Sequence, residues 1–237
     1  MEIKPLASSS KANCIYLSDG VTPLLLDAGL RFRETQRALS FQVSSIRAAL
    51  ITHSHKDHCR AVADLIKAGI DCRMLQQTAD EIGVSGHRVK IIEPKEPFRL
   101  GTWEIVAFET VHDVPSAGYL LANKNGEKVL YLTDSEYSPW KFIGVSHFLV
   151  EINFDQETIR QNVADGIIDR EHYKRVIRSH FGLERAVEFF RSCDLSNTQG
   201  LWILHMSNEN ANAERIKRTL QEAFGKPVYL KAQGPPC

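Results

Sequence analysis

The sequence predicts an α/β protein in which two β-sheets pack together and helices cover their outer faces. Short strand patterns come in two groups, one near the N-terminus and one in the middle, and the last third is mainly helical. Of the 237 residues, 43% are hydrophobic and 24% are charged, which excludes wholesale disorder. No linker, low-complexity tract or internal repeat divides the chain, so we expect one domain over residues 1–237.

The N-terminal third predicts an antiparallel meander followed by helices. Runs of strand length are separated by the serine-rich loop at residues 8–10 and by the Asp19-Gly20 turn. A helix comes next, then a buried strand, then a second helix that stops at Gly69. The expected strands cover residues 3–7, 14–18, 24–27 and 48–52, and the expected helices cover 31–39 and 58–67.

The middle of the chain is rich in strand patterns, and helical patterns dominate after it. An Asn125-Gly126 pair is a strong hairpin signal between the last two strands of the middle group. Strand groups followed by helices in both halves are the observation that predicts two packed sheets. The remaining strands are expected at 89–92, 103–109, 118–122, 128–133, 148–152 and 201–204, and the helices around Ile159, Tyr173, Ala186 and Ile216.

Charge and cysteine usage exclude several classes of protein. Lys plus Arg number 29 and Asp plus Glu number 29, so overall positive charge does not hold a nucleic acid. The scattered cysteines Cys14, Cys59, Cys72, Cys193 and Cys237 form no CxxC pair, which argues against a disulfide framework. No leader pattern is present, and no apolar run approaches the ~18 residues of a membrane span. We expect a cytoplasmic, soluble protein with no membrane contact.

The most informative segment is HSHKDH at residues 53–58, which follows a predicted buried strand. Residues two apart in an extended chain point the same way, so His53 and His55 share a face. Asp57 and His58 fall where a helix begins, which turns them back toward the strand end. Imidazole and carboxylate donors together suit zinc, manganese or iron. The alternative, a capping aspartate beside solvated histidines, is weaker because four donors stand in six positions.

This run resembles the HxHxDH motif of the metallo-β-lactamase superfamily. That resemblance implies an αβ/βα four-layer sandwich, in which two mixed sheets with helices outside hold a dinuclear metal site. Further residues resemble the other motifs of the superfamily in the right order, each at the end of a predicted strand. They are Asp27 in LLLDAG, His112 in ETVHD, Asp134 in LYLTDS and His205 in WILHMS.

The resemblance also implies ligands for two divalent ions, Zn²⁺ or Mn²⁺. Asp27 would hydrogen-bond the 53–58 segment and orient it. Taken singly, these residues have ordinary alternatives: a turn for Asp27, a cap for Asp134, a buried core position for His205. The implied ligands are His53, His55 and His112 for one ion and Asp57, His58 and His205 for the other, with Asp134 bridging them.

Within the superfamily, the chain most resembles the small bacterial branch of WalJ-type (YycJ-type) exonucleases. Residues 8–14 resemble its Ser/Gly loop ending in Asn-Cys, residues 151–155 its Glu-x-Asn-x-Asp element, and residues 205–210 its His-Leu-Ser-x-Glu-Asn element. His180, in SHFG, resembles a further histidine of that branch. Phe154 replaces the usual His, and Phe-Gly at 181–182 replaces Leu-Ser, so the resemblance leaves the substrate preference open.

The function expected from these resemblances is metal-dependent hydrolysis of phosphodiester bonds in DNA, as a nuclease or exonuclease, through a hydroxide that bridges the metals. Asp57 would ligate a metal and orient that hydroxide. His180 is the candidate proton donor to the leaving oxygen. An exposed residue at a helix start is an equal alternative for His180. Two dications would offset Asp57 and Asp134, so zero net charge does not exclude a nuclease.

Candidate substrate contacts lie in two places. Ser10, Lys11 and Asn13 form a loop that offers hydroxyl groups, backbone N–H groups and one cation to a phosphate, with a simple turn as the alternative. Asn153 is a further candidate, with a supporting or helix-capping role as the alternative. In the basic run 170–178, Arg170, Lys174 and Arg178 stand four apart and line one helix face, which would suit nucleic acid; a solvated helix face is the alternative. The rival functions are a hydrolase of the same fold acting on a small phosphoester, cyclic nucleotide or lactone, and a catalytically silent metal- or nucleic-acid-binding module. The sequence does not indicate whether the protein is a monomer or an oligomer.

Overall fold

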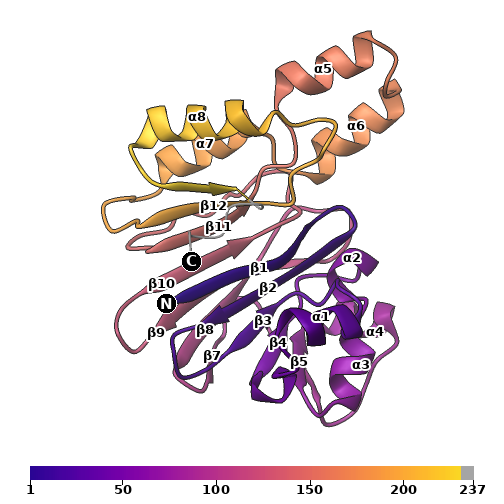
Figure 1. Ribbon diagram of the computed structural model, residues 1–237, viewed down its shortest axis with the longest axis vertical. Coiled ribbons are helices and arrows are strands. Elements are labelled where there is room, and N and C mark those ends of the chain that lie inside the picture. The colour runs from indigo at the N-terminus through magenta and orange to yellow at the C-terminus, as the bar shows by residue number, and fades with distance from the viewer. Residues whose placement is uncertain (231–237) are drawn as a thin grey trace. The chain divides into compact units, whose positions relative to one another are not determined.

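The computed structural model describes residues 1–230, which divide into two compact units (Figure 1). Unit 1 comprises Met1–Glu109 and Val114–Gly126, and unit 2 comprises Thr110–Asp113 and the described part of Glu127–Cys237. Cys237 lies outside the described residues. Among the helices described, none is long and apolar enough to cross a membrane. The single domain expected over residues 1–237 remains a prediction.

Unit 1 is built on a six-stranded sheet whose strands follow the chain order from β1 to β6. The first three strands pair antiparallel, as the predicted meander requires, and β3 to β6 pair parallel. The parallel strands β3 and β4 are fully buried apolar triplets, the pattern of strands covered on both faces. The six strands are β1 (Glu2–Ser9), β2 (Ala12–Ser18), β3 (Leu24–Leu26), β4 (Ala48–Leu50), β5 (Asp71–Met74) and β6 (Val89–Ile91).

Short helices connect these strands, and one prediction needs correction. The single helix expected over 58–67 is two helices, because the Ala61 amide donates to Ala28 O at 2.8 Å instead of continuing the helical ladder. The first of them begins at Lys56, two residues before the expected start. The helices of unit 1 are α1 (Phe32–Ala38), the 3₁₀ helix η1 (Val43–Ser45), α2 (Lys56–Cys59), α3 (Val62–Lys67) and α4 (Gln76–Ile82).

A second, antiparallel group of strands also belongs to unit 1: β7 (Pro97–Leu100), β8 (Trp103–Glu109) and β9 (Ala117–Asn123). Two buried polar groups tie it to the first sheet. Trp103 Nε1 donates to Thr22 O at 2.9 Å, and the Tyr119 hydroxyl donates to Ile51 O at 2.6 Å. The strand β8 confirms its predicted range, and β9 extends one residue beyond the predicted 118–122 at each end.

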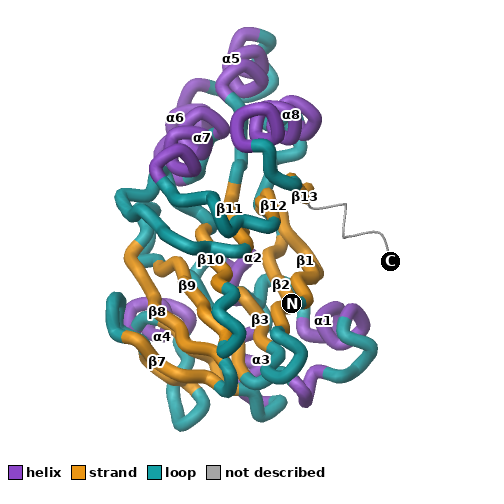
Figure 2. The backbone as a smooth tube through the Cα atoms, turned by 90° about the vertical axis from the view of Figure 1, so that its left-hand side faces the viewer, coloured by secondary structure: helices purple, strands orange, loops and turns teal. Residues whose placement is uncertain are grey.

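Unit 2 contains four parallel strands in the order β10 to β13, with four helices gathered on one side of them (Figures 1 and 2). Phe148 lies under α7, with edge-to-face contacts to Phe189 and Phe190. The carboxyl ends of parallel strands meet at one edge, so side chains at these ends come together. The elements are β10 (Lys128–Leu132), β11 (His147–Glu151), α5 (Gln156–Ala164), α6 (Arg170–Ser179), α7 (Leu183–Ser192), β12 (Gly200–Leu204), α8 (Ala213–Phe224) and β13 (Val228–Leu230).

Candidate metal centre

The segment at residues 53–58, here called the histidine loop, leaves β4 and enters α2 in unit 1. Its imidazole rings are in contact: the His53 ring centroid lies 4.7 Å from that of His55 and 4.2 Å from that of His58. His53 and His58 are buried, while His55 and Asp57 are half-buried. The loop therefore gathers the neighbouring donors that the sequence indicated.

Asp27, which directly follows β3, fixes the histidine loop through hydrogen bonds. Its Oδ2 lies 2.7 Å from His58 Nδ1, and its Oδ1 accepts hydrogen bonds from Thr52 N at 2.8 Å and from the Thr52 hydroxyl at 3.0 Å. The Thr52 hydroxyl in turn lies 2.9 Å from His53 Nδ1. Asp27 is fully buried, so these bonds replace its hydration. Asp27 thus orients His58 directly and His53 through Thr52, a residue that the sequence reasoning missed.

The backbone after Asp27 braces the histidine loop as well. Ala28 N donates to His58 O at 2.7 Å, and Gly29 N donates to Asn13 O at 2.8 Å. The chain passes so close here that a Cβ atom on Gly29 would lie 1.5 Å from Asp57 O. Only glycine fits this approach, since a backbone carbonyl is the obstacle.

The predicted substrate-contact loop of unit 1 divides into two parts. Ser10 and Lys11 are exposed at the turn between β1 and β2. Asn13 is buried, and its Nδ2 lies 2.9 Å from His58 Nε2 and 3.3 Å from Asp57 Oδ2. Asn13 therefore contacts two members of the histidine loop. A contact of Ser10, Lys11 or Asn13 with substrate remains a prediction.

A second group of donors, here called the Glu151 cluster, forms in unit 2 from Asp134, Glu151, His180 and His205. One donor atom from each lies within 4.8 Å of the others. Glu151 is at the centre: its Oε1 lies 2.6 Å from His180 Nδ1 and 2.9 Å from His205 Nδ1. His205 Nδ1 also lies 2.7 Å from Asp134 Oδ1. One buried carboxylate thus orients both imidazoles.

The other oxygen of Glu151 is held by backbone groups. Its Oε2 accepts hydrogen bonds from Ser135 N at 3.2 Å and Phe181 N at 3.3 Å. The sequence reasoning placed Glu151 in a motif but gave it no role. A signal was present in the sequence, because Glu151 directly follows the apolar run 148–150 of a predicted strand. In the structure it is 0% exposed, and a buried carboxylate needs partners inside the protein.

Burial and charge act against each other in the Glu151 cluster. Burial alone would lower the pKa of His205, but Asp134 and Glu151 raise it to about 10. Burial likewise opposes the protonated form of His180, and the Glu151 carboxylate outweighs it, so the pKa of His180 is raised. The pKa of Glu151 is lowered because His180 outweighs the cost of burial. The pair His180–Glu151 therefore favours the charged forms.

His112 belongs to the same unit and is anchored to the end of α6. Its Nδ1 donates to Ser179 O at 3.0 Å, and its Nε2 lies 3.9 Å from Asp134 Oδ2 and 3.1 Å from Asp113 Oδ1. Burial lowers the pKa of His112, although Asp134 and Asp113 oppose that effect. The neutral imidazole that a metal requires is therefore favoured here.

Three of the predicted site residues have a backbone conformation that side chains rarely adopt. The φ angle is 60° at Asp27, 45° at Asp134 and 47° at His205, in the left-handed region. Each follows the end of a strand, β3, β10 or β12. Strain of this kind persists only where surrounding contacts impose it, and it concentrates at functional sites.

Phe154 and Gly182, which differ from the residues usual in the WalJ-type branch, pack against each other, so the two differences are coupled. A Cβ atom on Gly182 would lie 2.6 Å from the Phe154 ring, so the ring occupies the space that a serine side chain would need. Nearby, Asn153 is buried and donates to His205 O at 2.9 Å, and Asp155 caps α5 by accepting from Thr158 N at 2.9 Å. A contact of Asn153 with substrate remains a prediction.

Comparison with known proteins places the chain in a family. A family model described as the β-lactamase superfamily domain matches residues 22–206, and the chain belongs to that superfamily. Exodeoxyribonuclease WalJ of Streptococcus pneumoniae is 26% identical, with 95% of this chain and 91% of the relative covered. Exodeoxyribonuclease YycJ of Bacillus anthracis is 23% identical, with 92% and 87% covered.

Solved structures agree on the fold. The metallo-β-lactamase fold protein YhfI from Bacillus subtilis is 14% identical, with a TM-score of 0.73 over 96% of this chain and 95% of that one. The short form of human tRNase Z is 15% identical, with a TM-score of 0.63 over 90% and 95%. The predicted superfamily, its WalJ-type branch, the α/β metallo-β-lactamase fold class and the metal-dependent hydrolase class are confirmed.

The family implies divalent metal ions, and the donors of each unit fit them. Metal-binding histidines are usually oriented by a hydrogen bond to the ring nitrogen that does not bind the ion. In both units the Nδ1 atoms have such partners: Thr52 for His53, Asp27 for His58, Ser179 for His112, and Glu151 with Asp134 for His205.

Proposed function

We propose that this protein hydrolyses phosphodiester bonds in DNA with two divalent metal ions, as an exonuclease. The observation that carries the proposal is the pair of relatives named exodeoxyribonucleases, which are matched over 91% and 87% of their lengths. The donor chemistry of the two units supports it, because imidazole and carboxylate together suit Zn²⁺ or Mn²⁺.

The metal ligands that we assign follow the superfamily motifs. When bound, the ions would supply positive charge that polarises the phosphoryl group and lowers the pKa of the attacking water. Asp27 and Glu151 would keep the ligating imidazoles in the required tautomer. The assigned ligands are His53, His55 and His112 for one ion and Asp57, His58 and His205 for the other, with Asp134 shared.

The protein's own groups account for two further requirements of hydrolysis. Asp57 is half-buried, and its carboxylate would accept a hydrogen bond from the attacking water and so orient it. His180 would donate a proton to the leaving oxygen from Nε2, since its Nδ1 is bound to Glu151 at 2.6 Å. The raised pKa of His180 keeps that proton available near neutral pH.

The exposed face of α6 supports a polyanionic substrate. Arg170, Lys174, Arg175 and Arg178 are all exposed on this helix, and only Lys174 has a close acidic partner on it, Glu171 at 2.8 Å. The helix ends at the Ser179 carbonyl that holds His112. Cations on a helix attached to a proposed ligand would guide a phosphate backbone toward the metals. The zero net charge of the chain is therefore compatible with a local DNA-binding face.

An activity panel tests the proposal. The purified chain is incubated with Mn²⁺ or Zn²⁺ and with linear duplex DNA, single-stranded DNA, and a chromogenic phosphodiester such as bis(p-nitrophenyl) phosphate. We expect DNA shortened from its ends, with loss of the activity in His53→Ala and Asp134→Asn. Turnover of the small ester alone would contradict a nuclease and favour the small-molecule hydrolase. No turnover of any substrate with metal bound would favour the silent binding module.

A further inference from the structure

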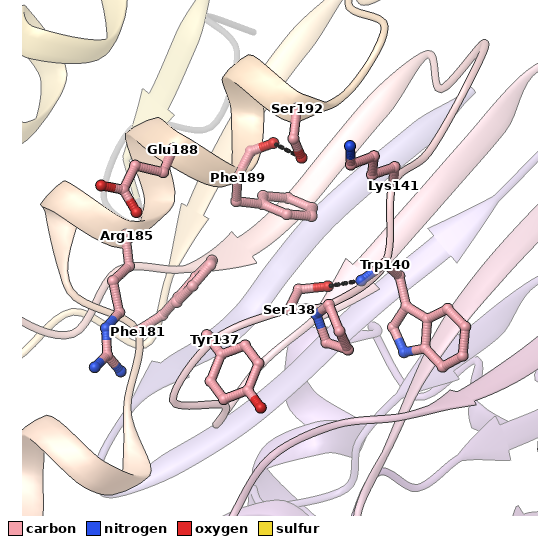
Figure 3. Close-up of a pocket in the computed structure, with 10 residues that line it drawn as sticks. Tyr137, Ser138, Trp140, Lys141, Phe181, Arg185, Glu188, Phe189 and Ser192 are labelled. Atoms are coloured by element: carbon pink, nitrogen blue, oxygen red, sulfur yellow. Dashed lines mark hydrogen bonds between the residues drawn. The ribbon is translucent and has the colours of Figure 1, made fainter.

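A cavity of about 370 Å³ opens in unit 2 (Figure 3), and Phe181, the residue after His180 of the Glu151 cluster, lines it. One wall is the loop at residues 137–141, and the other is Phe181 with one face of α7. The loop belongs to the connection between β10 and β11, which contains no helix or strand. Long connections without secondary structure in a compact protein are commonly functional.

The cavity offers an aromatic surface at its mouth. Tyr137 is 46% exposed, whereas Phe181 and Phe189 form a buried wall. Figure 3 shows the Tyr137 ring at the edge of the cavity, across from Phe189. A flat ligand can therefore stack on the tyrosine while it contacts apolar groups behind.

The same cavity carries cations. Lys141 is exposed at its rim, and Arg185 lines it from α7. Arg185 Nη1 donates to Glu136 O and to Glu136 Oε1, both at 2.9 Å, which fixes the guanidinium position. Glu188 is the acidic residue among those lining the cavity. The Arg185–Glu136 ion pair offsets one positive charge, so Lys141 supplies the cation beside the aromatic platform, a combination that matches a base attached to a phosphate.

Hydrogen bonds tie the aromatic platform to the Glu151 cluster. The Ser135 hydroxyl donates to Tyr137 O at 2.7 Å, and Ser135 N donates to Glu151 Oε2 at 3.2 Å. Tyr137 follows Asp134 by three residues, a span of at most about 11 Å. On the other wall, Phe181 directly follows His180. A ligand in the cavity therefore lies within one or two nucleotides of the proposed catalytic groups.

We propose that this cavity receives one unpaired nucleobase of the DNA strand, stacked on Tyr137, next to the phosphodiester that is cleaved. The inference rests on the proposed function, since it takes DNA as the substrate. A base inside a duplex is stacked and paired and does not fit such a cavity, so the strand must be single-stranded or frayed at this point. The enzyme would therefore prefer ends with an overhang to blunt ends.

A binding experiment without cleavage tests the cavity separately from the activity. A duplex with a short single-stranded overhang carries the fluorescent base 2-aminopurine at its end, in two versions for the 3′ and 5′ ends. The chain is loaded with Mn²⁺, and phosphorothioate linkages at the labelled end slow hydrolysis during the measurement. The variants are Tyr137→Ala, Tyr137→Phe, which keeps the ring, and Ile143→Ala, an exposed control on the same loop that does not line the cavity.

We expect the fluorescence of one version to be quenched by the wild-type chain, by Tyr137→Phe and by Ile143→Ala. Tyr137→Ala should bind about 5- to 150-fold more weakly, the range for loss of one stacked base. Unchanged binding and quenching by Tyr137→Ala, with normal thermal unfolding, would overturn the inference while DNA hydrolysis by the wild-type chain stands. Quenching that depends on Tyr137 in a chain that cleaves no DNA would sustain base binding and reject the nuclease. No quenching with either version would overturn the inference.

Discussion

The histidine loop and the Glu151 cluster supply the same kinds of donor by opposite routes. The loop places four donors within residues 53–58, and Asp27 from the neighbouring strand orients two of them, His58 directly and His53 through Thr52. The cluster draws its members from positions 134, 151, 180 and 205, and a central glutamate orients two of them. A site whose donors lie close together in the chain can be predicted from a single sequence. A site assembled from several strand ends can be recognised only from known family motifs or from the structure.

The comparison is tested most severely by removing one metal donor from each region. His53→Ala and Asp134→Asn should each lower kcat/KM on DNA by more than about 100-fold, because outer hydrogen-bond partners alone cost 10- to 100-fold. Metal content is measured on the same samples by mass spectrometry. His87→Ala, an exposed histidine outside both regions, is the matched control. Retained activity in either variant would remove that residue from the metal site.

His180 tests whether the Glu151 cluster does chemistry beyond holding metal. His180→Ala should lower kcat by about 10²- to 10⁴-fold, the contribution of a general acid, with unchanged metal content. The pKa of His180 is raised above 6.5 by Glu151, so the active, protonated form persists below that raised pKa. Wild-type kcat should therefore fall as pH rises through it, and the fall should begin at lower pH in Glu151→Gln. A pH profile that is the same in both enzymes would contradict this role.

The two orienting carboxylates should have smaller and comparable effects. Asp27→Asn and Glu151→Gln each keep the shape of the side chain but remove the charge that orients the imidazoles. Each should weaken metal affinity by about 10- to 100-fold. Competition with a fluorescent zinc chelator measures both constants. If only one variant loses metal affinity, then only that carboxylate contributes to metal binding, and the two regions differ in this respect.

The smallest expected effect concerns helix caps, in which the units also differ. No side-chain hydrogen bond caps α2, α3 or α4 of unit 1, whereas Asp155 and Asp169 cap α5 and α6 of unit 2. Asp169→Ala should destabilise the protein by about 1 kcal/mol. Asp155→Ala should cost more, because Asp155 also accepts from Asn212 N at 2.8 Å. Urea unfolding followed by circular dichroism gives both values, and equal values would rule out the second bond as a contributor.

Much of the fold was predictable because its signals are local. The meander of β1 to β3, the strand β8 and the helix α1 follow from periodicity and turn residues within each segment. The strand β5 was missed, since Asp71 and Arg73 interrupt its apolar run. The structure explains Arg73: its guanidinium lies 4.7 Å above the Phe98 ring, a partner distant in the chain.

The sequence by itself determined the donors in the histidine loop, the order of the motifs and the superfamily, because these depend on residue types and spacing along the chain. Tertiary structure decided which oxygen orients which ring. Thr52 and Glu151 carry no motif for this task, and their roles exist only where separate strands end at one edge. The same holds for the cavity beside Tyr137, because its walls come from a loop and a helix that adjoin only after the parallel strands of unit 2 have paired.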